Sequence, residues 1–309
     1  MSVLEKFKRI KENDRVLLIW NEQRRIRGNL DFKKVSDEEY VQKLYQDAFK
    51  KTLDLTNPQT FNEKLQWLKL NYRDSLMTQC ADKYGVRQYL EDKGYGYLLN
   101  ELIAQYESVD DINLEELPDR FVLKGTHGSG WNLIVHQKDQ INWPVWKKIM
   151  KSWMKQNLYF YGREWVYRDI KPRIICEKYL EDSSGELRDY KVFCFNGEPR
   201  MIQVDLGRFS NHRRNLYDPQ WNLMPFRINY ENSETEVEKP NSLQSMIRIA
   251  GELSKDFPHV RADFYDVNGK LYFGELTFFH ESGTGKFEPE EYDRIIGDWL
   301  TLPPKITGE

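Results

Sequence analysis

The chain is poor in the residues that build disulfide frameworks and structural metal sites. Among its 309 residues it has three cysteines and five histidines. The cysteines, Cys80, Cys176 and Cys194, form no CxxC pair, and the histidines are scattered without the spacing of zinc ligands. The sequence therefore predicts neither a disulfide framework nor a structural zinc site. Cys176 and Cys194 stand in apolar stretches, where we expect core residues.

Long apolar runs and an excess of one charge are also missing. No run reaches the length of a membrane span, and the charged N-terminal stretch lacks the apolar centre of a secretory signal. The 46 Lys and Arg residues nearly balance the 49 Asp and Glu residues, leaving a net charge of −3. This balance argues against a general attraction to nucleic acid or membranes. We expect a soluble cytoplasmic protein that meets an anionic ligand with a local cluster.

Both common glycine signatures of nucleotide binding, GxGxxG and GxxxxGK[ST], are absent from the most glycine-rich stretch. That stretch is FVLKGTHGSGWN, residues 121–132, in which an apolar run ends at Lys124 and a glycine-rich loop leads to a second apolar run at 133–136. Glycines let backbone N–H groups approach an anion closely, and the lysine adds a cation. The pattern predicts a flap-like hairpin over a phosphate, with an ordinary Gly/Ser turn as the alternative.

Hydrophobic periodicity divides the chain into three parts. Residues 1–75 read as a helical N-terminal region, with helices on both sides of Asn57-Pro58. Residues 76–171 read as an α+β lobe that carries the glycine-rich loop. Residues 172–309 read as a second α+β lobe with these parts in order: a strand at 172–180, a hairpin turning at Asn196-Gly197, a long loop over 208–235, a helix at 242–257 and a hairpin turning at Asn268-Gly269. We therefore predict an α+β fold of two lobes.

The last hairpin, RADFYDVNGKLYFGELT, gathers residues that could bind a metal, and the length of its turn decides whether they share a face. With a two-residue Asn-Gly turn, Asp263 falls opposite Gly274 and the two carboxylates of Asp263 and Glu275 point to opposite faces. With a three-residue loop, Arg261 falls opposite Glu275, and all the polar residues share one face. A Mg²⁺ site needs the second register, so we predict the three-residue loop.

A surface salt-bridge patch is the alternative interpretation of Arg261, Asp263 and Glu275. Against it, Glu275 stands in an otherwise apolar strand, where an unpaired charge is costly, and a second glycine-serine loop follows directly. These neighbours favour a binding site.

At this point the chain resembles a family, the ATP-grasp superfamily and specifically its TupA-like branch, which is associated with teichuronopeptide and other surface-polysaccharide (capsule) biosynthesis. The resemblance covers roughly residues 40–303. It rests on six motifs in a fixed order: NPQTFNEKLQWLKL, ADKYGVRQYL, FVLKGTHGSGWN, KPRIICEKYL, DYKVFCFNGEPR and FPHVRADFYDVNGKLYFGELTF. The family implies an ATP-grasp fold, with ATP held between two α+β lobes.

Carried over residue by residue, the resemblance implies a nucleotide site. Lys83 and Lys124 would contact the phosphates, with Lys191 as a further contact. The loop from Thr126 to Trp131 would cover the phosphates; it contains His127, Gly128, Ser129 and Gly130. The hinge would meet the adenine through Glu177, Lys178 and Leu180, and either Glu181 or Asp182 would reach the ribose hydroxyls.

The resemblance also implies the reacting end of the site. Asp263 and Glu275 match the Mg²⁺ carboxylates, while Arg261 and Lys124 match the catalytic cations around the transferred phosphoryl group. Thr277 stands where many ATP-grasp ligases have asparagine, and its hydroxyl is a weaker ligand, so the number of metal ions stays open. His127 and His280 flank the site, either as substrate contacts or as packing residues. Arg208, Arg213 and Arg214 bind an acidic substrate or form a solvated charge run.

The implied activity is that of a carboxylate–amine ligase that uses ATP and Mg²⁺ and works through an acyl phosphate. Its partners would be a carboxylate, such as a uronic acid of a saccharide, and an amine or amino acid, with no nucleic acid. A carbohydrate kinase, a polysaccharide glycosyltransferase and a non-catalytic nucleotide-binding protein are the alternatives.

Overall fold

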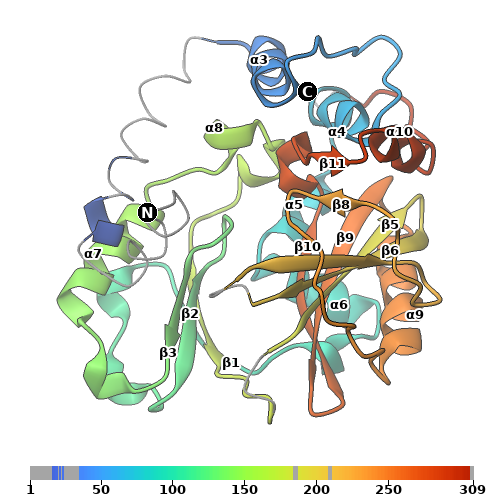
Figure 1. The fold of residues 1–309 in the computed structure, drawn as a ribbon. Helices are drawn as coiled ribbons and strands as arrows, with labels where there is room; N and C mark the ends of the chain where they lie inside the picture. The colour runs from blue at the N-terminus through green and yellow to red at the C-terminus, as the bar shows by residue number, and fades with distance from the viewer. Residues whose placement is uncertain are drawn as a thin grey trace.

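The computed structural model describes residues 16–19, 21, 23, 35–183, 187–207 and 211–306. Two antiparallel sheets form the centres of two lobes, which lie side by side in Figure 1 with β2 and β3 on the left and β9 and β10 on the right. Helices pack around both sheets, so the predicted α+β fold of two lobes is confirmed.

The first sheet has four strands in the order β1-β4-β2-β3. Their bounds are β1 Leu102–Tyr106, β2 Phe121–Gly125, β3 Asn132–Val135 and β4 Ile174–Lys178. The glycine-rich loop joins β2 to β3, as the sequence predicted. The strand β4 pairs with both β1 and β2, so it lies in the first sheet, although the sequence analysis grouped its residues with the second lobe.

The second sheet has five strands in the order β10-β9-β5-β6-β7. Their bounds are β5 Asp189–Phe195, β6 Glu198–Leu206, β7 Arg213–Tyr217, β9 His259–Val267 and β10 Lys270–Thr277, and a separate two-stranded ladder joins β8 Arg227–Ile228 to β11 Phe287–Glu288. The prediction of one long loop over 208–235 was wrong, because β7 and β8 lie within it. The first three residues of β7 are polar and give no strand signal, yet Arg214 is buried against Asp205 of β6. Arg208 lies outside the described residues.

The described helices flank the sheets (Figure 1). The α-helices are α3 Asp37–Phe49, α4 Phe61–Asn71, α5 Ser75–Ala81, α6 Gly85–Asp92, α7 Trp143–Trp153, α8 Tyr159–Gly162, α9 Leu243–Ser254 and α10 Glu291–Gly297. Short 3₁₀ segments include η5 Trp165–Tyr167 and η6 His280–Gly283. None of the described helices is long and apolar enough to cross a membrane.

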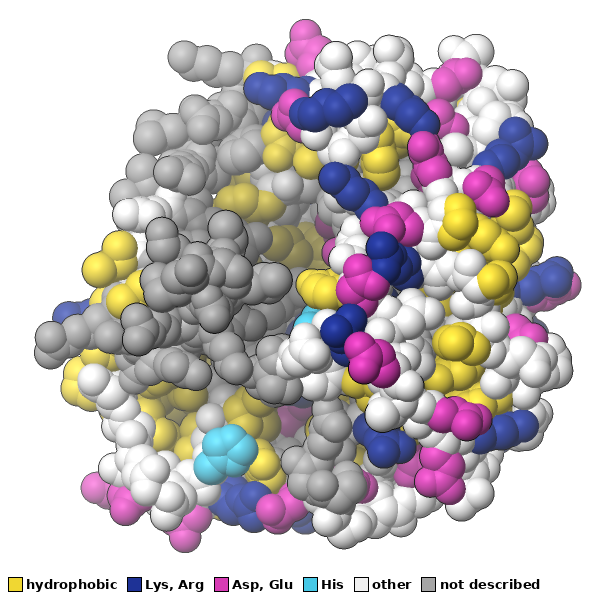
Figure 2. All heavy atoms as spheres, in the orientation of Figure 1, with side chains coloured by type: hydrophobic (Ala, Val, Ile, Leu, Met, Phe, Trp, Pro, Cys, Tyr) yellow, Lys and Arg dark blue, Asp and Glu magenta, His cyan; other side chains and the backbone are white. Residues whose placement is uncertain are grey.

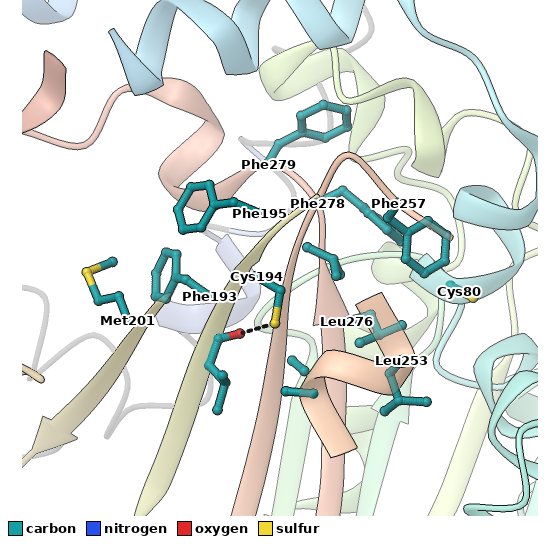
Figure 3. Close-up of a cluster of buried hydrophobic side chains, with 14 of the residues drawn as sticks. Cys80, Phe193, Cys194, Phe195, Met201, Leu253, Phe257, Leu276, Phe278 and Phe279 are labelled. Atoms are coloured by element: carbon teal, nitrogen blue, oxygen red, sulfur yellow. Dashed lines mark hydrogen bonds between the residues drawn. The ribbon is translucent and has the colours of Figure 1, made fainter. Parts of the chain in front are cut away.

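Each sheet has one face that is apolar and an opposite face, called the polar face below, that carries polar as well as apolar side chains. In the second lobe, Val192, Ala262 and Phe264 face α9 in a large core, and Figure 3 shows Phe193, Cys194 and Leu253 within the same cluster. In the first lobe, Leu123 and Cys176 pack against α7. The polar face of each sheet is therefore left to build a site, and the three cysteines are free and buried, as expected for core residues.

The helix α4 begins as the sequence predicted and packs on the second lobe. Thr60 accepts from the backbone N–H of Glu63, and the Glu63 carboxylate accepts from the backbone N–H of Thr60, which completes a capping box. Phe61 and Leu65 of this helix belong to the core of the second sheet. Asn62 donates to a carboxylate oxygen of Asp293 in α10 at 2.9 Å. The helix is thus part of the second lobe's structure.

Charges of both signs are interspersed over the surface. On the face in Figure 2, Lys and Arg side chains alternate with Asp and Glu side chains over the right-hand half. Among the described residues many surface charges are paired; Arg200 with Glu198 and Arg227 with Glu288 are examples. The described part of this face offers no extended basic patch of the kind that nucleic acid requires.

The buried His259 makes stability depend on pH. Its Nδ1 donates to the carbonyl of Cys194 at 2.9 Å, and burial lowers its pKa to about 3. Below a pH of about 6.5 the His259 ring binds a proton in the unfolded chain but not in the native state. The free energy of unfolding therefore falls as the pH falls. His259→Phe keeps an aromatic ring among Phe61 and Phe195 and removes this proton.

We expect the drop in unfolding free energy between pH 7 and pH 5 to be smaller in His259→Phe than in the wild type by about 2 kcal/mol. Urea unfolding at both pH values measures it. Equal drops in the two proteins would show that His259 does not carry this dependence, whatever the variant's absolute stability.

Candidate active site

The polar face of the first sheet carries a lysine, a glutamate and an arginine. The strand register places Val122 opposite Glu177, and Lys124 opposite Ile175, so these four side chains share the face that points away from the α7 core. Lys124 Nζ donates to Glu177 Oε2 at 2.6 Å, and Arg87 of α6 donates to Glu177 Oε1 at 3.3 Å. On this face Val122 and Ile175 form an apolar surface, and the buried Glu177 carboxylate lies between Lys124 and Arg87 of α6. Lys124 and Glu177 therefore lie together, as a nucleotide wall requires.

The glycine-rich loop folds over its own tryptophan. Trp131 is buried, and a Cβ added to Gly128 would lie 2.5 Å from its ring. Ser129 and Gly130 are exposed at the tip, and Gly130 has a φ of +74°. Only glycine lets the backbone lie this close to the ring at position 128, and a left-handed conformation at 130 also favours glycine. The tip of the loop is therefore its part that is open to solvent.

Two predicted loop contacts, Thr126 and His127, are buried below the loop. Thr126 is 0% exposed and His127 is 2% exposed. His127 Nε2 donates to the carbonyl of Trp153 in α7 at 2.9 Å, and burial lowers its pKa to about 4. The histidine is therefore neutral and anchors the loop to α7. Of the two interpretations of His127, the geometry favours packing over ligand contact.

Gly128→Ala is expected to weaken nucleotide binding about tenfold or more, because the added methyl group forces the Trp131 ring or the loop to move. Titration calorimetry with a non-hydrolysable ATP analogue and Mg²⁺ measures the change. Gly94→Ala is the control, since Gly94 lies two residues after α6, has no neighbour within 4 Å that a Cβ would meet, and has a φ of +78°, so the strain of this substitution stays away from the loop. Equal affinities in the two variants would show that the loop's close packing does not matter for binding.

The hairpin of β9 and β10 corrects the predicted register. Val267 pairs with Lys270 across a two-residue turn in which Asn268 and Gly269 have φ values of 52° and 81°. The prediction of a three-residue loop was therefore wrong, and Arg261 does not lie opposite Glu275. In a regular ladder this two-residue turn would point the carboxylates of Asp263 and Glu275 to opposite faces of the sheet. A β-bulge at Gly274 adds one residue to β10, so the two carboxylates nevertheless share one face.

Beyond the bulge, the polar residues share one face. Glu275 lies opposite Asp263, and Thr277 lies opposite Arg261. Arg261 donates from Nε and Nη2 to the two oxygens of Asp263, at 2.7 Å each, and from Nη2 to Thr277 Oγ1 at 3.1 Å. Its Nη1 donates to Nδ1 of His280 at 2.9 Å. The four predicted residues of the hairpin are thus in mutual contact, and His280 joins them from η6.

Burial and neighbouring charges set the protonation of this cluster. Burial alone would raise the pKa of Glu275, but Lys83 and Arg261 hold that pKa well below its ordinary value, so the carboxylate is ionised. Burial raises the pKa of Asp263, and the Arg261 guanidinium opposes this shift. Burial and the charges of Arg261 and Arg214 hold the pKa of His280 well below its ordinary value. His280 is therefore a neutral acceptor for Arg261.

Lys191 extends the cluster along the second sheet. It is 4% exposed, pairs with Asp189 of its own strand, and lies 3.3 Å from Asp263 and 3.8 Å from Asp205. Lys191 was predicted from the sequence, whereas Asp189 and Asp205 were not. The spacing of Asp189 and Lys191 could have indicated Asp189, because residues two apart on a strand share a face.

Lys83 connects the two lobes. It follows α5, and its backbone N–H donates to the carbonyl of Thr126 at 3.2 Å. Its Nζ donates to the carbonyl of Gly128 at 3.1 Å and to Glu275 Oε2 at 2.9 Å. One lysine therefore contacts both the glycine-rich loop and the hairpin. This contact brings the two predicted walls of the site together.

The residues after β4 lie at the edge of this arrangement. Lys178 is exposed and pairs with Glu101, while Glu181 is exposed and pairs with Arg120 at 2.7 Å. Asp182 accepts from the backbone N–H of Asn268 at 2.8 Å, so it touches the turn of the hairpin. Leu180, which precedes Glu181 in the sequence, is half-buried. Glu181 and Asp182 therefore both stay predictions for the ribose contact.

The donor set of the hairpin fits a magnesium ion that is shared with phosphates. Oxygen atoms of Asp263, Glu275 and Thr277 lie on one face, with Thr277 Oγ1 3.3 Å from Glu275 Oε1. Mg²⁺ takes one or two carboxylates and completes its shell with phosphates and water. Within the described ranges, no group of three His, Cys, Asp or Glu residues is arranged to hold a metal by itself. The protein therefore supplies part of a shell.

Comparison with known proteins gives one family. The model of a family described as TupA-like ATP-grasp matches residues 63–301. No curated protein matches the chain. The match spans the glycine-rich loop, both sheets and the hairpin, and it confirms the resemblance that the six motifs carried.

Several solved ligases are similar to the chain in structure. The D-alanine–D-alanine ligase of Bacillus anthracis has 19% identity over 64% of this chain and 57% of its own, with a TM-score of 0.39. That of Helicobacter pylori has 12% identity over 79% and 70%, with a TM-score of 0.39. The ATP-grasp ligase PsnB, solved with a minimal precursor, Mg and ADP, has 11% identity over 70% and 57%, with a TM-score of 0.38. The chain thus spans little more than half the length of two of these three ligases.

Proposed function

The chain belongs to the TupA-like ATP-grasp family, and from this premise we propose that it is an ATP- and Mg²⁺-dependent carboxylate–amine ligase. The observation that carries the proposal is the contact of Lys83 with both the glycine-rich loop and Glu275. This contact sets the glycine-rich loop directly against the carboxylate pair. We expect a site of this kind to bind a nucleoside triphosphate and to transfer its terminal phosphoryl group.

The first lobe binds the nucleotide in this proposal. Val122 and Ile175 offer an apolar surface for the adenine, and Glu177 lies on the same face of the sheet between Lys124 and Arg87. Lys83 and Lys124, which pair with Glu275 and Glu177 here, would pair with the phosphates when the nucleotide binds. The phosphates carry more negative charge than one glutamate and attract the two lysines more strongly. The N–H groups at Ser129 and Gly130 cover the phosphates from the loop tip, as backbone donors do for anions.

The second lobe carries the reacting end. Asp263, Glu275 and Thr277 would hold Mg²⁺, which would offset the negative charge on the phosphates. Arg261 stands beside this pair with its Nε and Nη1 groups bonded to Asp263 and His280, so it is held in place for the transferred phosphoryl group. Lys191 supplies a further cation from the neighbouring strand.

The reaction proceeds in two balanced steps. An oxygen of the substrate carboxylate bonds to the γ-phosphorus of ATP as the bond to the β-γ bridging oxygen breaks, which gives an acyl phosphate and ADP. The amine nitrogen then attacks the acyl carbon, inorganic phosphate leaves, and the amine loses a proton. The chain's own contribution is to orient the reactants and to exclude water under the closed loop, since water would hydrolyse the acyl phosphate.

A uronic acid of a surface polysaccharide or its precursor is the proposed carboxylate, and an amino acid is the proposed amine. This choice is supported only by the resemblance to the TupA-like branch. The site itself, with cations on both walls, suits an anionic acceptor of any kind.

A screen for ADP release tests the proposal, with ATP and Mg²⁺ offered to pairs of uronic acids and amino acids. We expect ADP release that requires both members of a pair. With an ¹⁸O-labelled carboxylate, the label should appear in inorganic phosphate, because the acyl phosphate passes on that oxygen. A phosphorylated sugar without an amine requirement would instead establish a kinase, and nucleotide-sugar turnover without ADP release would establish a glycosyltransferase.

A further inference from the structure

The turn that follows β10 has a backbone conformation that few sequences adopt. Glu281, Ser282 and Gly283 have φ values of 47°, 53° and 65°, so two successive residues with side chains are left-handed. This conformation is unfavourable for a residue with a side chain and persists only where surrounding contacts impose it. Some part of the structure must therefore hold this turn.

The helix α4 supplies the contacts. Lys69 Nζ donates to the carbonyl and the hydroxyl of Ser282, at 2.8 and 2.9 Å, and Gln66 Nε2 donates to the carbonyls of Ser282 and Gly283, at 3.0 and 2.9 Å. Both donors are fully buried, with 0% of Lys69 and 0% of Gln66 exposed. The motif NPQTFNEKLQWLKL, which the nucleotide site left without a role, thus carries the donors that hold the turn.

Two glycines allow this close approach. A Cβ on Gly283 would lie 2.7 Å from Gln66 Nε2, and a Cβ on Gly162 would lie 2.3 Å from the Ser282 hydroxyl. Side chains at these positions would push the turn away from α4 or from α8. The turn is therefore enclosed on two sides by elements far away in sequence.

The same turn begins with a residue of the site. His280 opens it and accepts from Arg261 Nη1, while Glu281 accepts from Arg214 Nη1 at 3.1 Å. Arg261 in turn donates to both oxygens of Asp263. The helix α4 thus holds Ser282, Ser282 lies two residues after His280 in the same turn, and His280 accepts from the guanidinium beside the carboxylate pair.

We propose that Lys69 is a positioning residue, which holds the turn at 281–283 so that His280 fixes Arg261 opposite the transferred phosphoryl group. The inference rests on the proposed function, because it gives α4 a part in that phosphoryl transfer. Lys69 touches neither nucleotide nor acceptor in this account and acts through His280.

A lysine at this position is costly to bury, but it has two partners. A buried ammonium is expensive to desolvate, and burial lowers the Lys69 pKa to about 8 although the Glu164 carboxylate opposes the shift. An apolar side chain would avoid this cost, but it would leave the Glu164 carboxylate without this neighbouring cation and the Ser282 carbonyl with Gln66 as its one remaining donor among the described hydrogen bonds. A loss of stability therefore does not distinguish a positioning role from a structural one, and the test has to compare kcat with affinity and follow His280 directly.

Lys69→Met removes the donors and keeps the length of the side chain, and α4 offers a matched control. Lys64 Nζ also donates to two backbone carbonyls, those of Gly297 and Leu300 at 2.8 and 2.7 Å, but these lie at the end of α10 and not in the site. We expect Lys69→Met to lower kcat for ADP release by about 10- to 100-fold and to leave the affinity for a Mg²⁺-bound ATP analogue within about threefold. Lys64→Met should leave both unchanged. Equal losses of kcat in the two variants, or none in Lys69→Met, would overturn the proposal.

A second readout needs no turnover. Nitrogen NMR of the histidine rings should show wild-type His280 as the neutral tautomer that is protonated at Nε2, because Nδ1 accepts from Arg261. In Lys69→Met we expect the Nδ1 signal to shift as this hydrogen bond loosens, with no shift in Lys64→Met. An unchanged signal in Lys69→Met would contradict the proposal. If the wild type releases no ADP with any acceptor, the proposed function fails, and the NMR comparison still decides whether Lys69 positions His280.

Discussion

Glu275→Gln is expected to lower the rate of ADP formation by about 10²- to 10³-fold. The amide keeps the shape of the side chain but removes the charge that Mg²⁺ needs and that pairs with Lys83 at 2.9 Å. Because Glu275 is ionised in the folded protein, the substitution removes a full charge at neutral pH. The effect should fall on kcat, since phosphoryl transfer depends on charge placed where the transition state develops it, and also on the affinity for Mg²⁺-bound ATP, since Glu275 is a proposed metal ligand. Steady-state assays of ADP release measure it.

Glu198→Gln is the matched control for this substitution. Glu198 begins β6 in the same sheet and pairs with Arg200 at the surface. Exposed pairs of this kind contribute little to stability, so this variant should behave as the wild type. If Glu275→Gln kept wild-type turnover, Glu275 would have no part in the chemistry, and the hairpin would be a structural ion-pair cluster.

Arg261→Met is expected to destabilise the fold by about 3 kcal/mol as well as to abolish turnover. Arg261 covers both oxygens of Asp263, which is 3% exposed, so its loss leaves a buried carboxylate with reduced compensation. We expect the lower end of the range for broken buried pairs, because Lys191 remains 3.3 Å from Asp263. Denaturant unfolding at pH 7 gives the free energy.

The double variant Arg261→Met/Asp263→Leu separates stability from catalysis. Replacing both members of a buried ion pair by apolar side chains is often close to neutral, so much of the lost stability should return. Activity should not return, because the metal carboxylate is gone as well. A double variant less stable than Arg261→Met would show that the pair is not coupled in the way the contacts imply.

Local signals in the sequence predicted most of the elements. The capping box of Thr60 and Glu63, the Asn196-Gly197 turn and the strands around the glycine-rich loop all formed as predicted, because neighbours in the chain decide them. The same holds for the Asn-Gly turn at 268–269, which kept its usual two residues. The prediction of a longer loop there was an inference from the supposed metal site, and it overrode a sound local signal.

The bulge at Gly274 could not be predicted from spacing alone. A glycine inside a strand is compatible with a bulge, but it is equally compatible with a regular ladder. Here a Cβ at position 274 would lie 3.1 Å from the backbone oxygen of Asp263, so the facing strand approaches closely. This close approach of β9 arises from the tertiary structure and is not visible in the local sequence. The bulge decides which face of the sheet Glu275 occupies, and the candidate site depends on that face.

Residues that act between distant segments were also missed. Buried Arg214 in β7 pairs with Glu281 from 67 positions further along the chain, and buried Lys69 meets Ser282 from 213 positions away. Both look like surface charges in the sequence, since charged residues are seldom buried without a partner. The partner becomes visible only when the fold brings the two segments together.

The Mg²⁺ dependence of ATP binding tests the central claim most directly, because it asks whether the loop wall and the carboxylate wall bind one ligand together. Calorimetric titration of the wild-type chain with a non-hydrolysable ATP analogue should give clearly tighter binding with Mg²⁺ than with a chelator present. It should give one site per chain, and the Mg²⁺ effect should vanish in Glu275→Gln. Binding that ignores Mg²⁺ in the wild type, or no binding at all, would contradict the account.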